Sequence, residues 1–357
     1  MKMAPVLAAL GRRRDAFESM LVHTGQHYDY EMSQIFVDDL DVPEPDHFLD
    51  VGSGSHVQQT ARVMERLETV LLEVDPDLMV VPGDVNSTLA AALVGAKADV
   101  PIAHVEAGLR SFDRSMPEEI NRQLTDQLSE FLFIHSPEAR DNLLREGCDP
   151  AKVHYVGNTM IDTLVAMRDG IGRADAPRAY GVEAGRYLVV TLHRPALVDG
   201  PLLAEALQNL AEVSRELTVL LPAHPRTEAA IAARDLPVPT ANLRLLPPLG
   251  YVEFLSLVAS AAAVLTDSGG IQEETTFLGV PCFTLRDNTE RPITIDMGTN
   301  RVLGLAPARI AEIPALIAQS AHAPHRTPPL WDGAAGERIA EVLLDAELPA
   351  RPVAQTL

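Results

Sequence analysis

The sequence predicts an α/β protein of two doubly wound domains with a cleft between them, and three observations support this prediction. Apolar runs of strand length alternate with segments of helical period along the chain, which is typical of parallel α/β layers. A length of 357 residues favours two domains over one. Residues 169–177 have turn composition and weak periodicity, and they divide the chain near its middle.

The expected strands are short apolar runs, and several end at polar residues suited to a site. They are residues 78–81, 102–105, 131–134, 153–156, 187–191, 218–221, 243–245, 263–266 and 281–284. We expect one domain at 1–169 and another at 170–335, with a last helix at about 336–346 that packs back on the first domain. Because ligands collect at the carboxyl ends of parallel strands, the polar residues there are the candidates for function.

Composition excludes several classes of protein. A net charge of −21 argues against nucleic acid as a partner, because a phosphate backbone needs an extended basic surface. The two cysteines lie far apart, which argues against a disulfide framework or a structural zinc site, and the eleven histidines show no metal-ligand spacing. No apolar run approaches a membrane span of roughly 20 residues, and no cleavable secretory segment opens the chain. We therefore expect a cytoplasmic protein.

The most informative stretch is Thr266-Asp267-Ser268-Gly269-Gly270, which follows a strand and leads into a helix. Free backbone N–H groups at a helix N-terminus bind anions, and paired glycines let a phosphate approach without meeting a Cβ. Glu274 lies about one and a half turns further on, where it could accept hydrogen bonds from a ribose diol. The stretch is either a cradle for a nucleoside diphosphate or a helix capped by Ser268.

Three carboxylate clusters follow strands in the first half. Asp84 comes just after strand 78–81, and it is either a site residue or a helix cap, a role that Asn86 or Ser87 could equally fill. Glu106 follows the next strand, where burial is costly unless the carboxylate is functional or paired, with Arg110 as the obvious partner.

Glu118 and Glu119 begin a later helix, where acids also favour the helix dipole. In the second half, His193 and His224 follow strands, and each is a core residue, a phosphate ligand or an acid/base. Arg291 stands in a polar loop and is either a surface cation or part of a cleft lining.

Together these residues make the chain resemble the non-hydrolysing UDP-N-acetylglucosamine 2-epimerases, a bacterial and archaeal family, from Lys2 to about Leu344. The resemblance rests on seven motifs in order: Gly83-Asp84, His104-Val105-Glu106-Ala107-Gly108-Leu109-Arg110, Pro117-Glu118-Glu119-Ile120-Asn121-Arg122, Gly157-Asn158-Thr159, His193-Arg194, Asp267-Ser268-Gly269-Gly270-Ile271-Gln272-Glu273-Glu274 and Thr289-Glu290-Arg291-Pro292.

The resemblance implies a glycosyltransferase-B-like fold of two Rossmann-like domains and a reaction without nicotinamide or metal cofactor. UDP leaves carbon 1 by anti elimination to give 2-acetamidoglucal, and re-addition gives UDP-N-acetylmannosamine. By this resemblance Asp84, Glu106 and Glu118 are the acid/base residues, and His193 assists the leaving UDP. The family also implies UDP-N-acetylglucosamine and UDP as ligands, a homodimer and a role in polysaccharide biosynthesis.

The resemblance also implies two sets of binding residues. The substrate set comprises Ser268, Gly269 and Gly270 for phosphates, Glu274 for ribose, the backbone near Phe254 for uracil, and Lys2 and Arg291. Some members bind a regulatory second UDP-N-acetylglucosamine, and the matching positions are Gln26, His27, Gln58, Arg62, Arg194 and His224.

The sequence departs from the family pattern at two places. Members open with an apolar strand and a Gly-Thr-Arg-Pro-Glu loop, whereas this chain begins at Met1-Lys2-Met3, and we expect a misplaced translation start rather than a shortened enzyme. Pro195 and Ala196 stand where the family usually has a glutamate and an asparagine, which weakens the second ligand site. A hydrolysing epimerase, a glycosyltransferase of the same fold and an inactive UDP-sugar sensor remain as alternatives.

Overall fold

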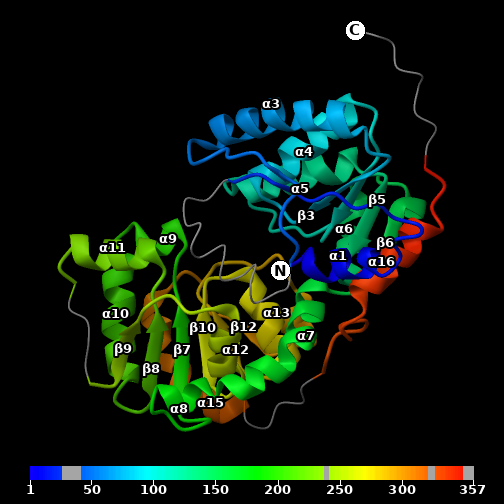
Figure 1. The fold of residues 1–357 in the computed structure, drawn as a ribbon. Coiled ribbons are helices and arrows are strands. Elements are labelled where there is room, and N and C mark those ends of the chain that lie inside the picture. The colour runs from blue at the N-terminus through cyan, green and yellow to red at the C-terminus, as the bar shows by residue number, and fades with distance from the viewer. Residues whose placement is uncertain (26–41, 237–240, 321–325, 349–357) are drawn as a thin grey trace. The chain divides into compact units, whose positions relative to one another are not determined.

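Parallel β-sheets form the centre of both units into which the chain divides (Figure 1). The computed structural model describes residues 1–25, 42–236, 241–320 and 326–348. Unit 1 comprises Met1–Val165 and Pro329–Leu357, and unit 2 comprises Ala166–Pro328. The α/β class with parallel sheets, predicted from the alternating pattern, is confirmed.

The main sheet of unit 1 has four parallel strands in the order β3-β4-β5-β6, which are Met79–Pro82, Ile102–Val105, Phe131–Ile134 and Val153–Tyr155. Sequential strands are neighbours, so the loops after β3 and β4 emerge side by side at the carboxyl edge. A separate parallel pair joins β1 (Val22–His23) to β2 (His47–Phe48).

Several helices of unit 1 pack on this sheet, and one comes from the end of the chain. Those within the described residues are α1 (Ala4–Gly11), α3 (His56–Val74), α4 (Asn86–Lys97), α5 (Pro117–Leu128), α6 (Pro137–Arg145), the 3₁₀ turn η1 (Pro150–Lys152), α16 (Ala335–Leu344) and α7 (Thr159–Ala174), which continues into unit 2. Helix α3 begins with a capping box, because Ser55 and Gln58 satisfy each other's backbone N–H groups.

Helix α16 packs on α1 and belongs to the core of unit 1. Ile339 and Ala340 are fully buried there with Val6 and Phe133. The approach is close, since a Cβ on Gly336 would lie 2.6 Å from the Pro5 carbonyl oxygen. Each Å² of apolar surface that is buried contributes about 25 cal/mol of stability, so the burial of several aliphatic side chains holds this last helix on the first unit.

In the part of unit 2 that the structure describes, six parallel strands form one sheet in the order β12-β11-β10-β7-β8-β9. Their bounds are Tyr187–Thr191 for β7, Thr218–Pro222 for β8, Leu243–Leu246 for β9, Ala263–Thr266 for β10, Cys282–Thr284 for β11 and Asn300–Val302 for β12. The chain winds outward in one direction from β7 and in the other from β10. The switch point therefore lies between β7 and β10, which is where ligands bind in such sheets.

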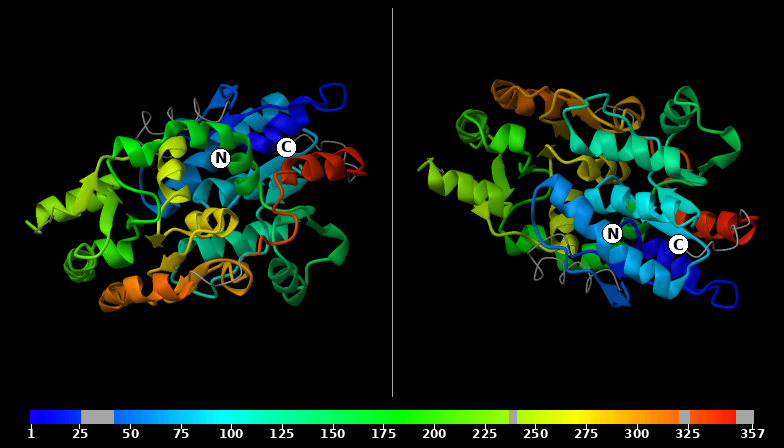
Figure 2. Two further views of the ribbon diagram at one scale, coloured as in Figure 1. Left: turned by 90° about the horizontal axis from the view of Figure 1, so that it is seen from below. Right: turned by 90° about the horizontal axis from the view of Figure 1, so that it is seen from above.

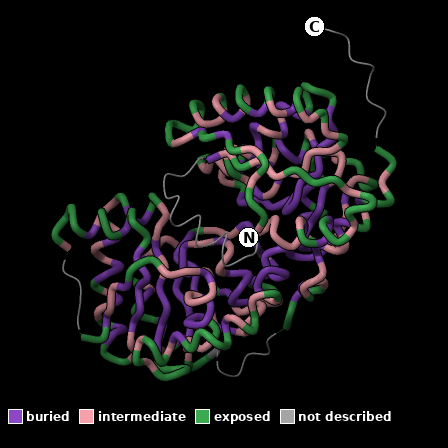
Figure 3. Tube along the Cα trace, in the orientation of Figure 1, coloured by how far each residue is buried: buried purple, intermediate pink, exposed green. Residues whose placement is uncertain are grey.

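Helices cover both faces of this sheet (Figures 1 and 2). They are α8 (Ala176–Ala179), α9 (Pro195–Val198), α10 (Leu202–Val213), α11 (Pro225–Ala233), α12 (Tyr251–Ala259), α13 (Gly269–Leu278), α14 (Ile293–Asp296), the 3₁₀ segment η2 (Pro307–Glu312) and α15 (Ile313–Ser320). The central strands β7 and β10 are buried along almost their whole length (Figure 3), as expected for a parallel sheet covered on both sides. Leu188 and Val190 of β7 point into the core that α10 covers.

All nine strands expected from the apolar runs are present, within one residue at either end. The structure adds β1, β2 and β12, which have two or three residues each and too little pattern to be recognised. None of the helices among the described residues combines the length and hydropathy that a membrane crossing requires.

Candidate functional site

Glu106 stands at the carboxyl end of β4 in a strained backbone conformation. Its φ of +75° lies in the left-handed region, which is uncommon for a residue with a side chain. The N–H groups of Glu106 and Ala107 both donate to the Phe133 carbonyl of β5, at 3.1 and 3.0 Å, and hold the turn in place. The side chain is 6% exposed, and Lys2 Nζ lies 2.7 Å from its Oε2.

The prediction that Arg110 pairs with Glu106 was wrong, because the Arg110 guanidinium contacts other carboxylates. Arg110 lies 2.7 Å from Asp126 and makes two hydrogen bonds to Glu146. Asp126 also contacts His104 Nδ1 at 2.6 Å, while His104 Nε2 donates to the Gly83 carbonyl at 2.7 Å. Burial disfavours the charge on Asp126, but the charge and hydrogen bond of His104, joined by Arg110, hold its pKa below the ordinary value.

Asp84 follows β3, next to the strand that ends at Glu106. It does not cap α4, whose N-cap is Val85 without a side-chain hydrogen bond, and neither Asn86 nor Ser87 takes that role. Instead Arg122 donates to Asp84 Oδ2 through Nε at 3.0 Å and through a terminal nitrogen at 2.6 Å. Asp84 is thus an ion-paired carboxylate that is still 20% exposed.

The neighbouring acids Glu118 and Glu119 have different surroundings at the start of α5. Glu119 is fully buried and accepts hydrogen bonds from Ser111, from the Phe112 N–H and from Arg122. It ties the loop after β4 to the arginine that holds Asp84. Glu118, in contrast, is half-buried.

In unit 2, His193 and Asp267 meet at the switch point between β7 and β10. His193 Nδ1 lies 2.8 Å from Asp267 Oδ1, and Oδ2 accepts the N–H groups of His193 and Arg194 at 2.8 Å each. Burial raises the pKa of Asp267, but His193 and these N–H donors outweigh burial and hold it below its ordinary value. A carboxylate on one ring nitrogen fixes the orientation of the imidazole.

The sequence alone did not single out Asp267 or Arg122 as functional supports. Asp267 lies within the glycine motif, but its partner His193 is distant in sequence, and only the strand order shows that β7 and β10 are neighbours. Arg122 lies on the face of α5 that turns toward the β3 loop. Its signal was the (i, i+3) spacing from Glu119, which predicts a shared helix face.

Helix α13 begins at Gly269, with Ser268 at the N-cap position. The Ser268 side chain makes no capping hydrogen bond, so the interpretation of this residue as a side-chain cap is wrong. A Cβ on Gly269 would overlap the guanidinium of Arg291, which therefore lies directly against the helix start. Arg291 is 6% exposed and pairs with Glu273 at 2.9 Å, so it is not a surface cation.

Glu274 is buried on the same helix beside Tyr251 of α12 and Glu273. Its Oε1 has no hydrogen-bond partner among the described residues. Burial raises its pKa to about 8, with the Glu273 charge adding to this and the Tyr251 hydroxyl opposing it. An unsatisfied buried carboxylate oxygen is costly, and a ligand hydroxyl would relieve that cost. Phe254 is half-buried on α12, and its N–H donates to the Gly250 carbonyl.

The residues expected at a second ligand site also have local structural roles. In unit 1, Gln58 completes the capping box of α3, and Arg62 donates to the carbonyls of Val51 and Ser53. In unit 2, His224 caps α11 by accepting from the Arg226 N–H.

Arg194 Nε donates to the Asp267 carbonyl, and the His193 and His224 rings lie 5.8 Å apart. Gln26 and His27 lie outside the described residues. The described part of the chain holds no group of three or more His, Cys, Asp or Glu side chains arranged for a metal ion.

Each unit gathers titratable side chains at the carboxyl edge of a parallel sheet, as α/β enzymes do. Unit 1 places Lys2, Asp84 and Glu106 at the carboxyl edge of its sheet, with Glu118 in the first turn of α5, and unit 2 places His193 and the start of α13 at its switch point.

Comparisons with known proteins give the family. The model of the UDP-N-acetylglucosamine 2-epimerase family matches residues 9–344. The UDP-N-acetylglucosamine 2-epimerase of Methanocaldococcus jannaschii is 39% identical over 354 residues, which cover 96% of this chain and 95% of that protein. The UDP-2,3-diacetamido-2,3-dideoxy-D-glucuronate 2-epimerase of Pseudomonas aeruginosa is 42% identical over 303 residues, 84% of each chain.

Solved structures agree with the sequence comparisons. The Methanocaldococcus jannaschii enzyme in complex with UDP-GlcNAc and UDP matches with a TM-score of 0.86 at 39% identity, over 96% of this chain and 95% of that one. The Neisseria meningitidis enzyme bound to UDP-GlcNAc also gives 0.86, at 29% identity over 97% and 96%. The chain belongs to the UDP-N-acetylglucosamine 2-epimerase family, non-hydrolysing type, and is an isomerase of that class.

Proposed function

We propose that this chain interconverts UDP-N-acetylglucosamine and UDP-N-acetylmannosamine by elimination and re-addition of UDP. The carbon 2 proton is not next to a carbonyl, so its direct removal is unfavourable. Departure of UDP from carbon 1 leaves an oxocarbenium that acidifies this proton. Loss of the proton gives 2-acetamidoglucal, and return of a proton to the opposite face with re-addition of UDP gives the epimer. No redox cofactor is required in this sequence of steps.

The observation that carries the proposal is the pair of acids on adjacent strand ends in unit 1. Asp84 and Glu106 follow neighbouring strands, and each is paired with a cation, Arg122 or Lys2. Two carboxylates on adjacent strand ends, each held in place by a cation, are suited to general acid–base catalysis. Glu118 supplies a third, half-buried acid for the opposite face of the sugar.

The features of unit 2 fit the UDP portion of the same substrate. The N–H groups at the start of α13, with Ser268, Gly269 and Gly270, would hold the diphosphate, and Arg291 adds positive charge there. Glu274 Oε1 would accept a ribose hydroxyl, and the backbone near Phe254 would meet the uracil.

His193 is held by Asp267 with Nδ1 engaged, so it would offer Nε2 to the departing phosphate. A homodimer and a second UDP-sugar site at Gln58, Arg62, Arg194 and His224 remain parts of the proposal.

One comparison supports a second candidate substrate. The Pseudomonas aeruginosa relative is named for a UDP-2,3-diacetamido glucuronate and is 42% identical to this chain. The same elimination chemistry applies at carbon 2 of that sugar. Supplying both UDP-sugars separately and comparing kcat/KM decides between them.

Proton NMR of UDP-N-acetylglucosamine in deuterated water with the purified chain tests the proposal. We expect the anomeric signal of UDP-N-acetylmannosamine and deuterium at carbon 2 of both epimers. Free N-acetylmannosamine without a nucleotide-linked epimer would instead indicate the hydrolysing reaction. UDP binding without any exchange would indicate a UDP-sugar sensor, and transfer of the sugar to an acceptor would indicate a glycosyltransferase.

Variants separate proton transfer from UDP binding. Asp84→Asn, Glu106→Gln and Glu118→Gln should each lower kcat at least about 100-fold, because general acid–base groups contribute that much, while the Kd for UDP changes little. Asp141→Asn, on the exposed surface of α6, is the matched control and should retain full turnover. Full activity in one of the three test variants would remove that residue from the acid/base set.

A further inference from the structure

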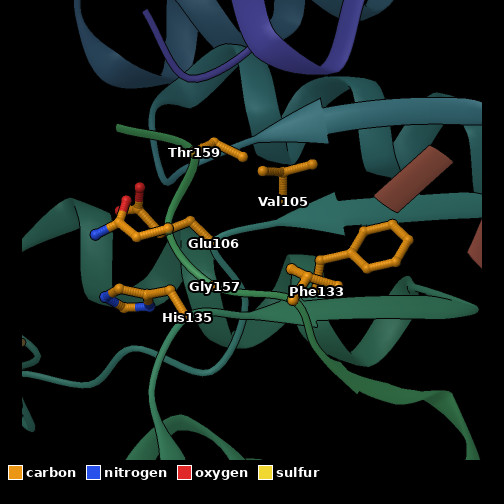
Figure 4. A pocket seen from close by; sticks show the side chains of 8 residues that line it. Val105, Glu106, Phe133, His135, Gly157 and Thr159 are labelled. Carbon is orange, nitrogen blue, oxygen red and sulfur yellow. The ribbon is translucent and has the colours of Figure 1, made fainter. Parts of the chain in front are cut away.

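A small pocket in unit 1 adjoins Glu106 and contains polar groups that the mechanism above does not use. It is lined by Glu106, His135, Asn158 and Thr159 together with Val105, Phe133, Val156 and Gly157. Figure 4 shows the Glu106 and His135 side chains projecting to the same side from neighbouring strand ends, and Phe133 to the other. The pocket therefore lies at the carboxyl edge of the sheet, next to a proposed acid/base residue.

Asn158 presents an unused hydrogen-bond donor in this pocket. The residue is 3% exposed, and its Oδ1 accepts the Met160 N–H at 2.9 Å, which caps the start of α7. This cap identifies Oδ1 as the acceptor end of the amide, so Nδ2 is its donor end. Within the described residues Nδ2 has no hydrogen-bond partner. A buried amide donor without a partner is costly and indicates a missing acceptor.

The walls of the pocket are fixed by the segment that precedes α16. The Trp331 ring stacks on His135 at 6.1 Å between centroids, and Trp331 Nε1 donates to the His135 carbonyl at 2.9 Å. Gly157 has a φ of +93°, and a Cβ there would overlap the Leu330 carbonyl oxygen. The donor of Asn158 is thus held in a rigid frame, as a binding subsite requires.

We infer that this pocket is the subsite for the acetamido group of the substrate, with Asn158 Nδ2 donating to the acetamido carbonyl oxygen. The inference rests on the proposed function. Glu106 acts there at carbon 2, and the acetamido group is the substituent on that same carbon, so a pocket shared with Glu106 faces it. An amide carbonyl is the acceptor that a buried neutral donor matches without an uncompensated charge. Asn158 is then a specificity-determining residue.

Comparing UDP-N-acetylglucosamine with UDP-glucose isolates the acetamido group, because UDP-glucose carries a hydroxyl at carbon 2. Calorimetric Kd values for UDP, UDP-glucose and UDP-N-acetylglucosamine would be measured on the full chain and on two variants. Asn158→Asp keeps the cap and the shape but removes the donor, and Asn158→Ser keeps a capping oxygen without adding charge. Thermal unfolding of both variants checks that the cap is retained.

We expect Asn158→Ser to raise the Kd for UDP-N-acetylglucosamine about five- to tenfold, as for the loss of a neutral hydrogen bond. Affinity for UDP and UDP-glucose should stay within about twofold. If UDP binding is intact but the variant binds both UDP-sugars equally more weakly, the acetamido subsite is overturned. The subsite is also overturned if the variant binds both UDP-sugars as tightly as the unaltered chain does. Failure of the unaltered chain to bind UDP would instead overturn the proposed function and this inference with it.

Discussion

Glu274 gives unit 2 a specific dependence of stability on pH. Its side chain is buried on α13, and burial raises its pKa from 4.5 to about 8. Between these two values the folded chain keeps a proton that the unfolded chain has released. The stabilisation is therefore complete below the lower pKa and is lost as the pH rises to the upper one. Replacing the carboxyl with the neutral amide, Glu274→Gln, should abolish this loss.

The size of the effect follows from the two pKa values. Each unit of difference corresponds to 1.36 kcal/mol, so the wild-type chain loses at most about 5 kcal/mol of unfolding free energy across this window relative to Glu274→Gln. The nearby charge of Glu273 and the hydroxyl of Tyr251 act in opposite directions on the pKa. A domain of this size shifts its unfolding midpoint by about 2–4 °C per kcal/mol, which gives a shift of at most about 10–20 °C.

The assay is thermal unfolding of the wild type, Glu274→Gln and a matched control at about pH 5, 6.5 and 8.5, a range that spans most of the window. Glu216→Gln serves as the control, because Glu216 is exposed in unit 2. We expect the midpoint of the wild type to fall relative to Glu274→Gln as the pH rises, and the midpoint of the control to follow the wild type. Parallel curves for all three proteins would refute the reasoning.

Three further changes probe the frame around the proposed acids. Gly157→Ala should lower the unfolding free energy by about 2–4 kcal/mol, because its φ is +93° and Leu330 leaves no room for a Cβ; urea unfolding tests this, and a neutral result would contradict the geometry. Glu119→Gln should lower the unfolding free energy by about 2–3 kcal/mol, because it weakens the buried ion pair with Arg122. Urea unfolding measures this loss too, and a loss below about 0.5 kcal/mol would contradict the prediction. Glu106→Gly should be more stable than Glu106→Ala by about 1 kcal/mol, since the φ is +75° there; equal stability would remove the claim of strain.

The fold could be predicted from the sequence because parallel strands buried on both faces are continuous apolar runs. Runs such as 187–191 and 263–266 have this pattern, and both are strands. The strand order could not be predicted, because pairing depends on contacts between distant segments. Without it, the meeting of His193 with Asp267 could not be foreseen.

The candidate acids could be located but not their partners. Asp84 and Glu106 follow apolar runs that are strands, so their place at the sheet edge follows from local pattern. Their ion pairs with Arg122 and Lys2 depend on how α5 and the start of the chain pack on the sheet. The expected pairing of Glu106 with Arg110 failed because Asp126 and Glu146 compete for the same guanidinium.

The strain at Glu106 indicates why this residue is held by so many contacts. A left-handed backbone costs about 1–2 kcal/mol in a residue with a side chain, and it persists only where neighbouring contacts determine it. Here two N–H groups share the Phe133 carbonyl, Gly108 donates to Asp126, and His104 ties the same aspartate to the β3 loop. The frame that fixes Glu106 thus also fixes the loop of Asp84, so the two proposed acids are positioned as a unit rather than one at a time.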